Sequence, residues 1–212
     1  MDTAEDAESY DAMDHSGPND AFVQRLLELG VRGEVLDVGC GPGHIALLLA
    51  AMHPDVRVTG VDLSDHMLRI AEEHREVSSH AERVRFAKAD AKGLPFADAS
   101  FDTVCSNTIL HHIPDPVPFL RECWRVLKPG GAFLVRDLFR PSSVPEIYAL
   151  VRRHAAGESL PAQELFRASL NAALTPDELR SAAKAAGLAG VELVVDTDRH
   201  MSLQRSASAS KA

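Results

Sequence analysis

Three glycines directly after an aspartate form the part of the sequence with the clearest chemical meaning. Gly39, Gly41 and Gly43 follow Asp37 in the segment Asp-Val-Gly-Cys-Gly-Pro-Gly. Because glycine has no Cβ atom, a ligand can approach the backbone of such a turn closely. A turn that binds pyrophosphate has the different spacing G-x-G-x-x-G and directs a helix N-terminus at negative charge. The acidic neighbour favours a cationic ligand group, such as an amino-acid ammonium. A turn that needs glycine for its geometry alone is the alternative.

Two further aspartates, Asp62 and Asp90, each follow an apolar segment that is typical of a strand. In doubly wound sheets, an acidic residue at the end of the second strand accepts hydrogen bonds from ribose hydroxyls. A carboxylate at the end of the third strand can accept one from an adenine amino group. The alternatives are that Asp62 caps the helix starting near Ser64 and that Asp90 is a loop residue without a ligand. Because three successive strand ends face one crevice, the sequence predicts that these carboxylates share one site.

The elements that must position these residues alternate along the chain. Apolar strands separated by helices indicate a parallel sheet covered on both faces, with right-handed crossovers. A polar turn between two short strands near the end of the chain predicts a closing antiparallel hairpin. The predicted fold class is α/β, a doubly wound, mostly parallel, seven-stranded Rossmann-like sheet. The predicted strands are 34–38, 56–61, 84–89, 101–106, 132–137, 191–196 and 201–205, and the predicted helices outside the insertion are 19–30, 44–53, 64–77, 116–127 and 175–186.

The domain boundaries follow from composition. The acidic segment 1–18 predicts a flexible N-terminal arm, and 19–205 predicts one domain. Within it, 144–173 interrupts the alternation with two helices and is interpreted as a helical insertion that caps the substrate. The low-complexity segment 206–212 predicts a disordered tail.

Four segments, 35–43, 58–64, 89–96 and 101–131, resemble one known family in their order and spacing. They are similar to the class I methyltransferases that depend on S-adenosylmethionine (SAM), in the small-molecule group related to the ubiquinone/menaquinone methyltransferases. The last segment includes Leu-His-His-Ile-Pro-Asp and Leu-Lys-Pro-Gly-Gly. The resemblance implies SAM as the cofactor and a small molecule as the methyl acceptor, with the methyl group passing to an O, N or C nucleophile.

The resemblance also assigns residues to the methionine end of the cofactor. Gly39, Gly41 and Gly43 would hold the methionine part of SAM, and Asp37 would lie near its ammonium, directly or through water. Asn107, just after the fourth strand, would line the cofactor pocket.

At the adenosine end, the resemblance assigns Asp62 to the ribose diol. Leu63 and Met67 would flank the adenine, and Asp90 with Ala91 would contact its edge.

Catalysis by proton transfer is a further hypothesis. An oxygen or acidic carbon nucleophile needs a base, and histidine has a suitable pKa. In similar O-methyltransferases the His before x-Pro-Asp can serve as that base, which here is His112, and Asp137 at the end of the fifth strand can orient it. The alternative is that His111 and His112 only pack or cap the following helix. His15 and Arg140 are the predicted substrate-side residues.

Composition narrows the function classes. The net charge is −9, and seven acidic residues precede the first basic residue, Arg25. Since no basic block is present to neutralise phosphates, nucleic acid is a disfavoured partner. The longest apolar run, 45–52, is too short to span a bilayer. The three cysteines, at unrelated spacings, predict neither a disulfide framework nor a metal site and favour a cytoplasmic location.

Two other functions stay open at this level. A nicotinamide-dependent oxidoreductase uses a similar sheet, but the glycine spacing and the Leu-Lys-Pro-Gly-Gly segment count against it. A protein that binds SAM without methyl transfer, as a regulatory or partner subunit or for other SAM chemistry, would keep the same cofactor residues. Nothing in the sequence predicts the oligomeric state or identifies the acceptor.

Overall fold

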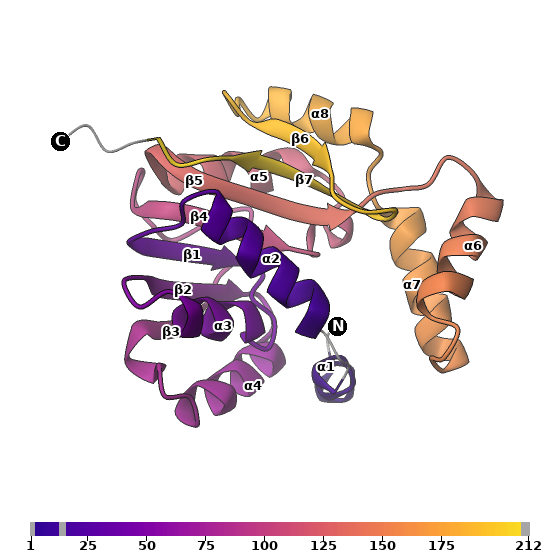
Figure 1. Cartoon of the computed structure of the whole chain (residues 1–212), viewed down its shortest axis with the longest axis horizontal. Coiled ribbons are helices and arrows are strands. Elements are labelled where there is room, and N and C mark those ends of the chain that lie inside the picture. The colour runs from indigo at the N-terminus through magenta and orange to yellow at the C-terminus, as the bar shows by residue number, and fades with distance from the viewer. Residues whose placement is uncertain (1–2, 13–15, 209–212) are drawn as a thin grey trace.

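A seven-stranded sheet forms the centre of the computed structural model, which describes residues 3–12 and 16–208. The strand order is β3-β2-β1-β4-β5-β7-β6 (Figure 1). Strands β1 to β5 pair with one another in parallel, whereas β7 is antiparallel to both β5 and β6. The predicted fold class is confirmed. The strands are β1 Glu34–Val38, β2 Arg57–Asp62, β3 Val84–Lys88, β4 Phe101–Asn107, β5 Leu127–Leu138, β6 Glu192–Val195 and β7 His200–Arg205.

Helices cover both faces of this sheet. Two of them begin at side-chain caps: the Ser64 side chain accepts a hydrogen bond from the Met67 amide, and Thr175 forms a capping box with Glu178. The helices are α1 Ala4–Asp11, α2 Ser16–Glu28, α3 His44–Met52, α4 Asp65–Glu76, α5 Pro116–Val126, α6 Val144–His154, α7 Leu160–Ala172 and α8 Pro176–Ala185. Two short 3₁₀ turns are η1 Ala81–Arg83 and η2 Leu110–His112.

Alternation along β1 divides the core into two layers. Val35 packs with the buried residues of α2 and α3, whereas its neighbour Leu36 packs with those of α5 and α8. This alternation follows from the two-residue period of a strand, which sends successive side chains to opposite faces. Strand β1 pairs with β2 on one side and β4 on the other. The chain therefore reverses its direction of winding at β1, and ligands of doubly wound sheets bind at the carboxyl ends of strands at that point.

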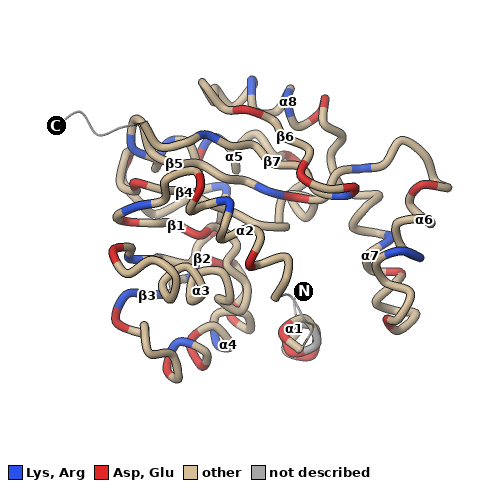
Figure 2. The backbone as a smooth tube through the Cα atoms, in the orientation of Figure 1, with Lys and Arg blue, Asp and Glu red and all other residues tan. Residues whose placement is uncertain are grey.

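The predicted N-terminal arm differs from the structure. The sequence predicts a flexible segment over 1–18, whereas most of this segment is helical, in α1 and the first turn of α2. Ala7 is fully buried and packs against Met67 and Ile70 of α4. The apolar contact explains why α1 is ordered although its other residues are mainly acidic (Figure 2).

The predicted tail is also partly ordered. The Ala207 amide donates a hydrogen bond of 2.8 Å to the Leu29 carbonyl, and the Ser208 amide donates one of 2.9 Å to the Gly130 carbonyl. The rest of the tail, 209–212, lies outside the described residues.

The insertion at 144–173 forms the two expected helices. Helices α6 and α7 pack on each other through Ile147, Leu150 and Leu170, and their shared core includes Leu138 at the end of β5. Figure 1 shows this pair beyond the carboxyl end of β5, away from the body of the sheet. Among residues 3–12 and 16–208, no helix has the length and apolarity needed to cross a membrane.

Candidate active site

A cavity of about 1010 Å³ opens at the carboxyl ends of the parallel strands. Its volume is that of a site for a cofactor-sized ligand. Its wall contains residues from the strand ends, the glycine-rich turn, α1, η2, α6, α7 and the β6–β7 turn. Eight of the ten residues assigned to the cofactor line this cavity: Asp37, Gly39, Gly41, Asp62, Leu63, Met67, Ala91 and Asn107.

Asp37 is the most unusual of these residues electrostatically. Its side chain is 2% exposed, and the thiol of Cys105, its neighbour on β4, lies 3.9 Å from Oδ1. The second oxygen, Oδ2, is buried and has no hydrogen-bond partner among the described residues. Burial, and secondly the negative charge of Asp62, raise the pKa of Asp37 to about 7. A buried, unmatched carboxylate oxygen on a cavity wall fits a cationic donor such as the ammonium of SAM.

The glycine-rich turn is attached to the neighbouring strand. The amides of Gly39 and Cys40 donate to the Val61 carbonyl at 2.7 Å and 3.0 Å. Gly41 has a φ of +52°, and a Cβ atom there would meet nothing within 4 Å. Because Gly41 lines the cavity, that open space belongs to the ligand site.

Gly43 has a different role from the one assigned to it. It does not line the cavity, and a Cβ atom there would lie 2.5 Å from the Phe86 ring and 3.1 Å from Ala71 Cβ. Its φ of +82° also favours glycine. Gly43 therefore allows the start of α3 to pack closely against β3 and α4.

Asp62 connects the turn to the next helix. Its Oδ2 accepts a hydrogen bond from the Gly41 amide at 3.0 Å, and its Oδ1 accepts one from the Ser64 amide at 2.9 Å. A carboxylate has about four acceptor positions, so each oxygen retains one for a ribose hydroxyl. Leu63 and Met67, which both follow Asp62 in the sequence, line the cavity, and Leu63 is 59% exposed.

The structure does not support the adenine contact assigned to Asp90. Its Oδ1 accepts hydrogen bonds from the Lys92 amide at 2.9 Å and from Lys92 Nζ at 2.8 Å. These bonds lower the pKa of Asp90 and hold its carboxylate at the exposed surface. The neighbours Ala89, Ala91 and Lys92 line the cavity, but Asp90 does not.

Asp137 was predicted to orient His112 and instead binds His111. Asp137 is 2% exposed, and its Oδ1 lies 2.8 Å from His111 Nδ1. Its Oδ2 also accepts the backbone amides of Leu110 and His111. The two histidines occupy the 3₁₀ turn η2, where successive side chains point about 120° apart. Only one of them can therefore face the end of β5.

The two histidines differ in protonation chemistry. Because a carboxylate accepts, His111 Nδ1 donates to Asp137, so that in the neutral form of the ring Nε2 is the acceptor. His112 makes no side-chain hydrogen bond with the described residues, and its ring centre lies 4.0 Å from that of His111. Burial, followed by the charge of His111, lowers the pKa of His112. Both rings line the cavity.

The wall near α6 and α7 contains residues that the sequence analysis missed. Phe166 and Leu165 of α7 and Ile113 after η2 provide apolar surface. His154 of α6 is paired with Asp198 at 2.9 Å and lies 3.0 Å from Arg199 of the β6–β7 turn. No local pattern connects these positions, because they come from elements far apart in the chain.

The comparisons with known proteins agree with this geometry. Residues 36–135 match the family model described as a methyltransferase domain. Over these residues, just under half of the chain, the sequence is similar to methyltransferase domains. The resemblance inferred from the sequence is confirmed.

Similar proteins include an O-methyltransferase of Aspergillus nomiae, 41% identical over 125 residues, which cover 58% of this chain and 55% of the relative. A ubiquinone/menaquinone biosynthesis C-methyltransferase of Geotalea daltonii is 34% identical over 124 residues, covering 58% of this chain and 53% of the relative. The aligned region thus spans about half the length of these relatives. A phosphoethanolamine N-methyltransferase of Haemonchus contortus, solved with S-adenosylhomocysteine (SAH), has a TM-score of 0.67 and 27% identity, covering 85% of this chain and 39% of that one.

Arg140, one of the two predicted substrate residues, does not line the cavity. The Arg140 guanidinium binds the Glu178 carboxylate at 2.7 Å and the Ala173 carbonyl at 3.2 Å, and it does not line the wall. It fixes the loop after β5 to the start of α8. His15 lies outside the described residues.

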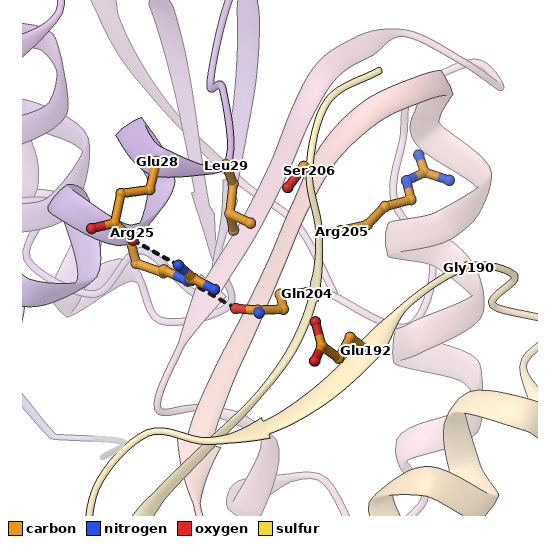
Figure 3. A pocket seen from close by; sticks show the side chains of 8 residues that line it. All are labelled: Arg25, Glu28, Leu29, Gly190, Glu192, Gln204, Arg205 and Ser206. Carbon is orange, nitrogen blue, oxygen red and sulfur yellow. Dashed lines mark hydrogen bonds and ion pairs between the residues drawn. The ribbon is translucent and has the colours of Figure 1, made fainter. Parts of the chain in front are cut away.

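A smaller hollow of about 220 Å³ lies between α2 and the strands β6 and β7 (Figure 3). Arg25 Nε donates a hydrogen bond of 2.9 Å to Gln204 Oε1 across it, and Arg25 also pairs with Glu28. The Arg25 cation is therefore already paired, and none of the residues assigned to cofactor, catalysis or substrate lines this hollow.

Proposed function

We propose that this chain is an enzyme that transfers a methyl group from SAM to an oxygen or acidic carbon atom of a small molecule. The observation that supports this most strongly is that one cavity contains both the residues suited to bind SAM and a histidine suited to act as a base. The unmatched carboxylate of Asp37 and the glycine-rich turn lie on its wall, as does the histidine of the His111–Asp137 pair.

SAM supplies an electrophilic methyl group on a sulfonium when it is bound. In this proposal Asp37 accepts the ammonium, Gly39 and Gly41 leave room for the methionine part, and Asp62 accepts the ribose hydroxyls. Leu63 and Met67 provide apolar contact for the adenine. Because the Asp37 carboxylate is buried, its interaction with a cation is less screened than on the surface.

His111 is the proposed general base. Asp137 holds the proton on Nδ1, so Nε2 can accept the proton that the acceptor loses as it attacks the methyl group. Asp137 also stabilises the imidazolium that results. This assignment replaces His112, whose ring has no carboxylate partner, and makes His112 a wall residue beside the base.

The wall opposite the glycine-rich turn supports an acceptor that is partly apolar. Phe166, Leu165 and Ile113 would contact its hydrophobic part. Burial, and secondly the charge of Arg136, lower the pKa of His200 to about 3, so this cavity residue is neutral at physiological pH. Arg199, paired with Asp198 and close to His154, is a polar group available at the same wall.

We place the proposed activity in the cytoplasm. Cys40, Cys105 and Cys123 are free and buried, as expected of a protein in a reducing compartment.

The test combines binding with turnover. SAH should raise the melting temperature and bind with a Kd of about 1 μM, near −8 kcal/mol, whereas NADH should do neither. Incubation with SAM and a panel of phenolic, hydroxylated and acidic-carbon acceptors should release SAH only when an acceptor is present. Absence of SAH binding would overturn the proposal. Binding without turnover on any of these acceptors would favour a SAM-binding protein that does not methylate.

A further inference from the structure

A cluster of two histidines and one aspartate lies at the edge of the cavity, outside the residues used above. Asp11 ends α1, His44 begins α3 directly after the glycine-rich turn, and His74 lies in the last turn of α4. One ligand atom from each lies within 4.8 Å of the others. His44 Nε2 is 2.9 Å from Asp11 Oδ1, and His74 Nε2 is 3.4 Å from Asp11 Oδ2.

The hydrogen bonding of His74 prepares its other nitrogen for a metal ion. His74 Nδ1 lies 2.9 Å from the Pro42 carbonyl, which can only accept, so Nδ1 carries the proton. In the neutral ring, Nε2 then directs a lone pair towards Asp11. A metal-binding histidine characteristically donates its second ring N–H to a carbonyl or carboxylate in this way.

Asp11 provides a second and independent observation. Its Oδ1 is buried and has no hydrogen-bond partner among the described residues, although His44 Nε2 is close. Buried carboxylate oxygens are normally matched by a donor or a cation. A neutral His74 facing the same carboxylate would add a repulsion between lone pairs, which a cation between the ligands removes.

The spacing of these atoms suits a small transition-metal ion. A tetrahedral zinc ion with bonds of about 2.0–2.1 Å places its ligand atoms about 3.3 Å apart. The two contacts to Asp11, 2.9 Å and 3.4 Å, are close to that value. The rings of His44 and His74 are stacked at 5.0 Å with an angle of 27°, and Nε2 of each lies near the Asp11 carboxylate. The three side chains are 25–35% exposed, which leaves a path for the ion and a water ligand.

We propose that Asp11, His44 and His74 bind a divalent transition-metal ion of the zinc type, which fastens α1 to the start of α3 and the end of α4. The other described attachments of α1 include the burial of Ala7 and an exposed pair between Glu8 and Arg69 at 3.2 Å, which is a weak contact. The metal site is structural and goes beyond the proposed function. Tyr10, next to Asp11, lines the cavity, so the ion holds that part of the wall in place.

The sequence analysis predicted no metal site because it considered only the cysteine spacings. The three ligands come from separate helices, and none of them lies within a short ligand motif. Only the packing of α1 on α4 brings the aspartate to the histidines.

The experiment uses the full chain, stripped of metal with a chelator and then titrated with Zn²⁺ in a calorimeter. We expect one ion per chain with a Kd of about 1 μM or lower, near −8 kcal/mol. Asp11→Asn, His44→Gln and His74→Gln should each weaken zinc binding by at least about tenfold. Glu8→Gln, which removes another carboxylate of α1, and His80→Gln, which removes another imidazole, should change it by less than about twofold.

A second measurement tests the fastening of α1. Zinc should slow amide hydrogen exchange in residues 4–11 of the wild type but not of His74→Gln, because a metal tie raises the free energy of local opening. Absence of saturable binding by the wild type, or wild-type zinc affinity in all three ligand variants, would overturn the site and leave the cluster as an ion pair. Zinc binding without slower exchange in α1 would overturn the fastening.

Discussion

The cofactor end and the acceptor end of the cavity are built in different ways. At the cofactor end, Asp37, Gly41 and Asp62 lie at or directly after strand ends, and backbone amides hold the turn to β2 and Asp62. At the acceptor end, the wall is assembled from η2, α7 and the β6–β7 turn. The first end is set by local chain geometry at the switch point of the sheet, whereas the second depends on how distant elements pack. One end can keep its ligand while the other changes its specificity.

The largest expected effect is a loss of kcat at the acceptor end of the cavity, without a change at the cofactor end. His111→Ala should lower kcat by about 10²–10⁴-fold, because the proposed base is lost, while SAH affinity stays within about twofold. His112→Ala should have a smaller effect on kcat, since its ring has no carboxylate partner. The measurement is steady-state kinetics with an active acceptor, together with SAH titration of each variant. Equal losses of kcat in the two variants would contradict the assignment of the base to His111 alone.

Substitutions in the glycine-rich turn should have the next largest effect, on SAH binding and on the melting temperature. Gly41→Val should weaken SAH binding by about 100-fold or more, because its side chain enters ligand space and its φ of +52° is unfavourable for valine. Gly43→Ala should mainly lower the melting temperature, because its Cβ atom would meet the Phe86 ring at 2.5 Å. Thermal melts and calorimetry measure both quantities. Normal SAH binding by folded Gly41→Val would show that the cofactor binds away from the glycine-rich turn.

The carboxylates of Asp62 and Asp90 should also differ in their effect on SAH binding. Asp62→Ala should weaken SAH binding by about 1–3 kcal/mol, roughly 5–150-fold, through loss of charged hydrogen bonds and of the contacts to Gly41 and Ser64. Asp90→Ala, whose carboxylate is bound to Lys92 at the surface, should change it by less than about twofold. A large loss of SAH affinity in Asp90→Ala would support the adenine contact predicted from the sequence.

The smallest effect is a pH dependence specific to the cofactor end. Burial and Asp62 raise the pKa of Asp37 to about 7 in the free protein. A bound ammonium favours the charged carboxylate and lowers that pKa, so binding releases a proton below pH 7. SAH affinity should fall by up to about tenfold per pH unit below pH 7 and be flat above it until the ammonium itself titrates. Calorimetry from about pH 5.5 to about pH 8 tests this, and Asp37→Asn should remove the dependence.

The sequence predicted most of the fold and the cofactor end because both have local signals. Strand and helix periodicity, glycine spacing and the caps at Ser64 and Thr175 all depend on neighbouring residues. For Asp90, Asp137 and Arg140, the sequence did not predict the partners that the structure shows. The choice of partner for each side chain, Lys92, His111 and Glu178, is decided by rotamers and packing. The same limit hid Asp11 at the end of an acidic helix.

The position of β7 has a consequence for how the chain reaches this structure. Residues 200–205 insert between β5 and β6, so β5 is paired on this side only by β7, the last described strand in the chain. Until then, β5 presents an unpaired edge that contains the apolar residues Phe133 and Val135. Such an edge is a template for pairing with another chain. We therefore expect partly folded chains in which β7 has not yet paired to aggregate through β5. The yield of folding, more than the stability of the native state, should then limit which substitutions the β6–β7 hairpin tolerates.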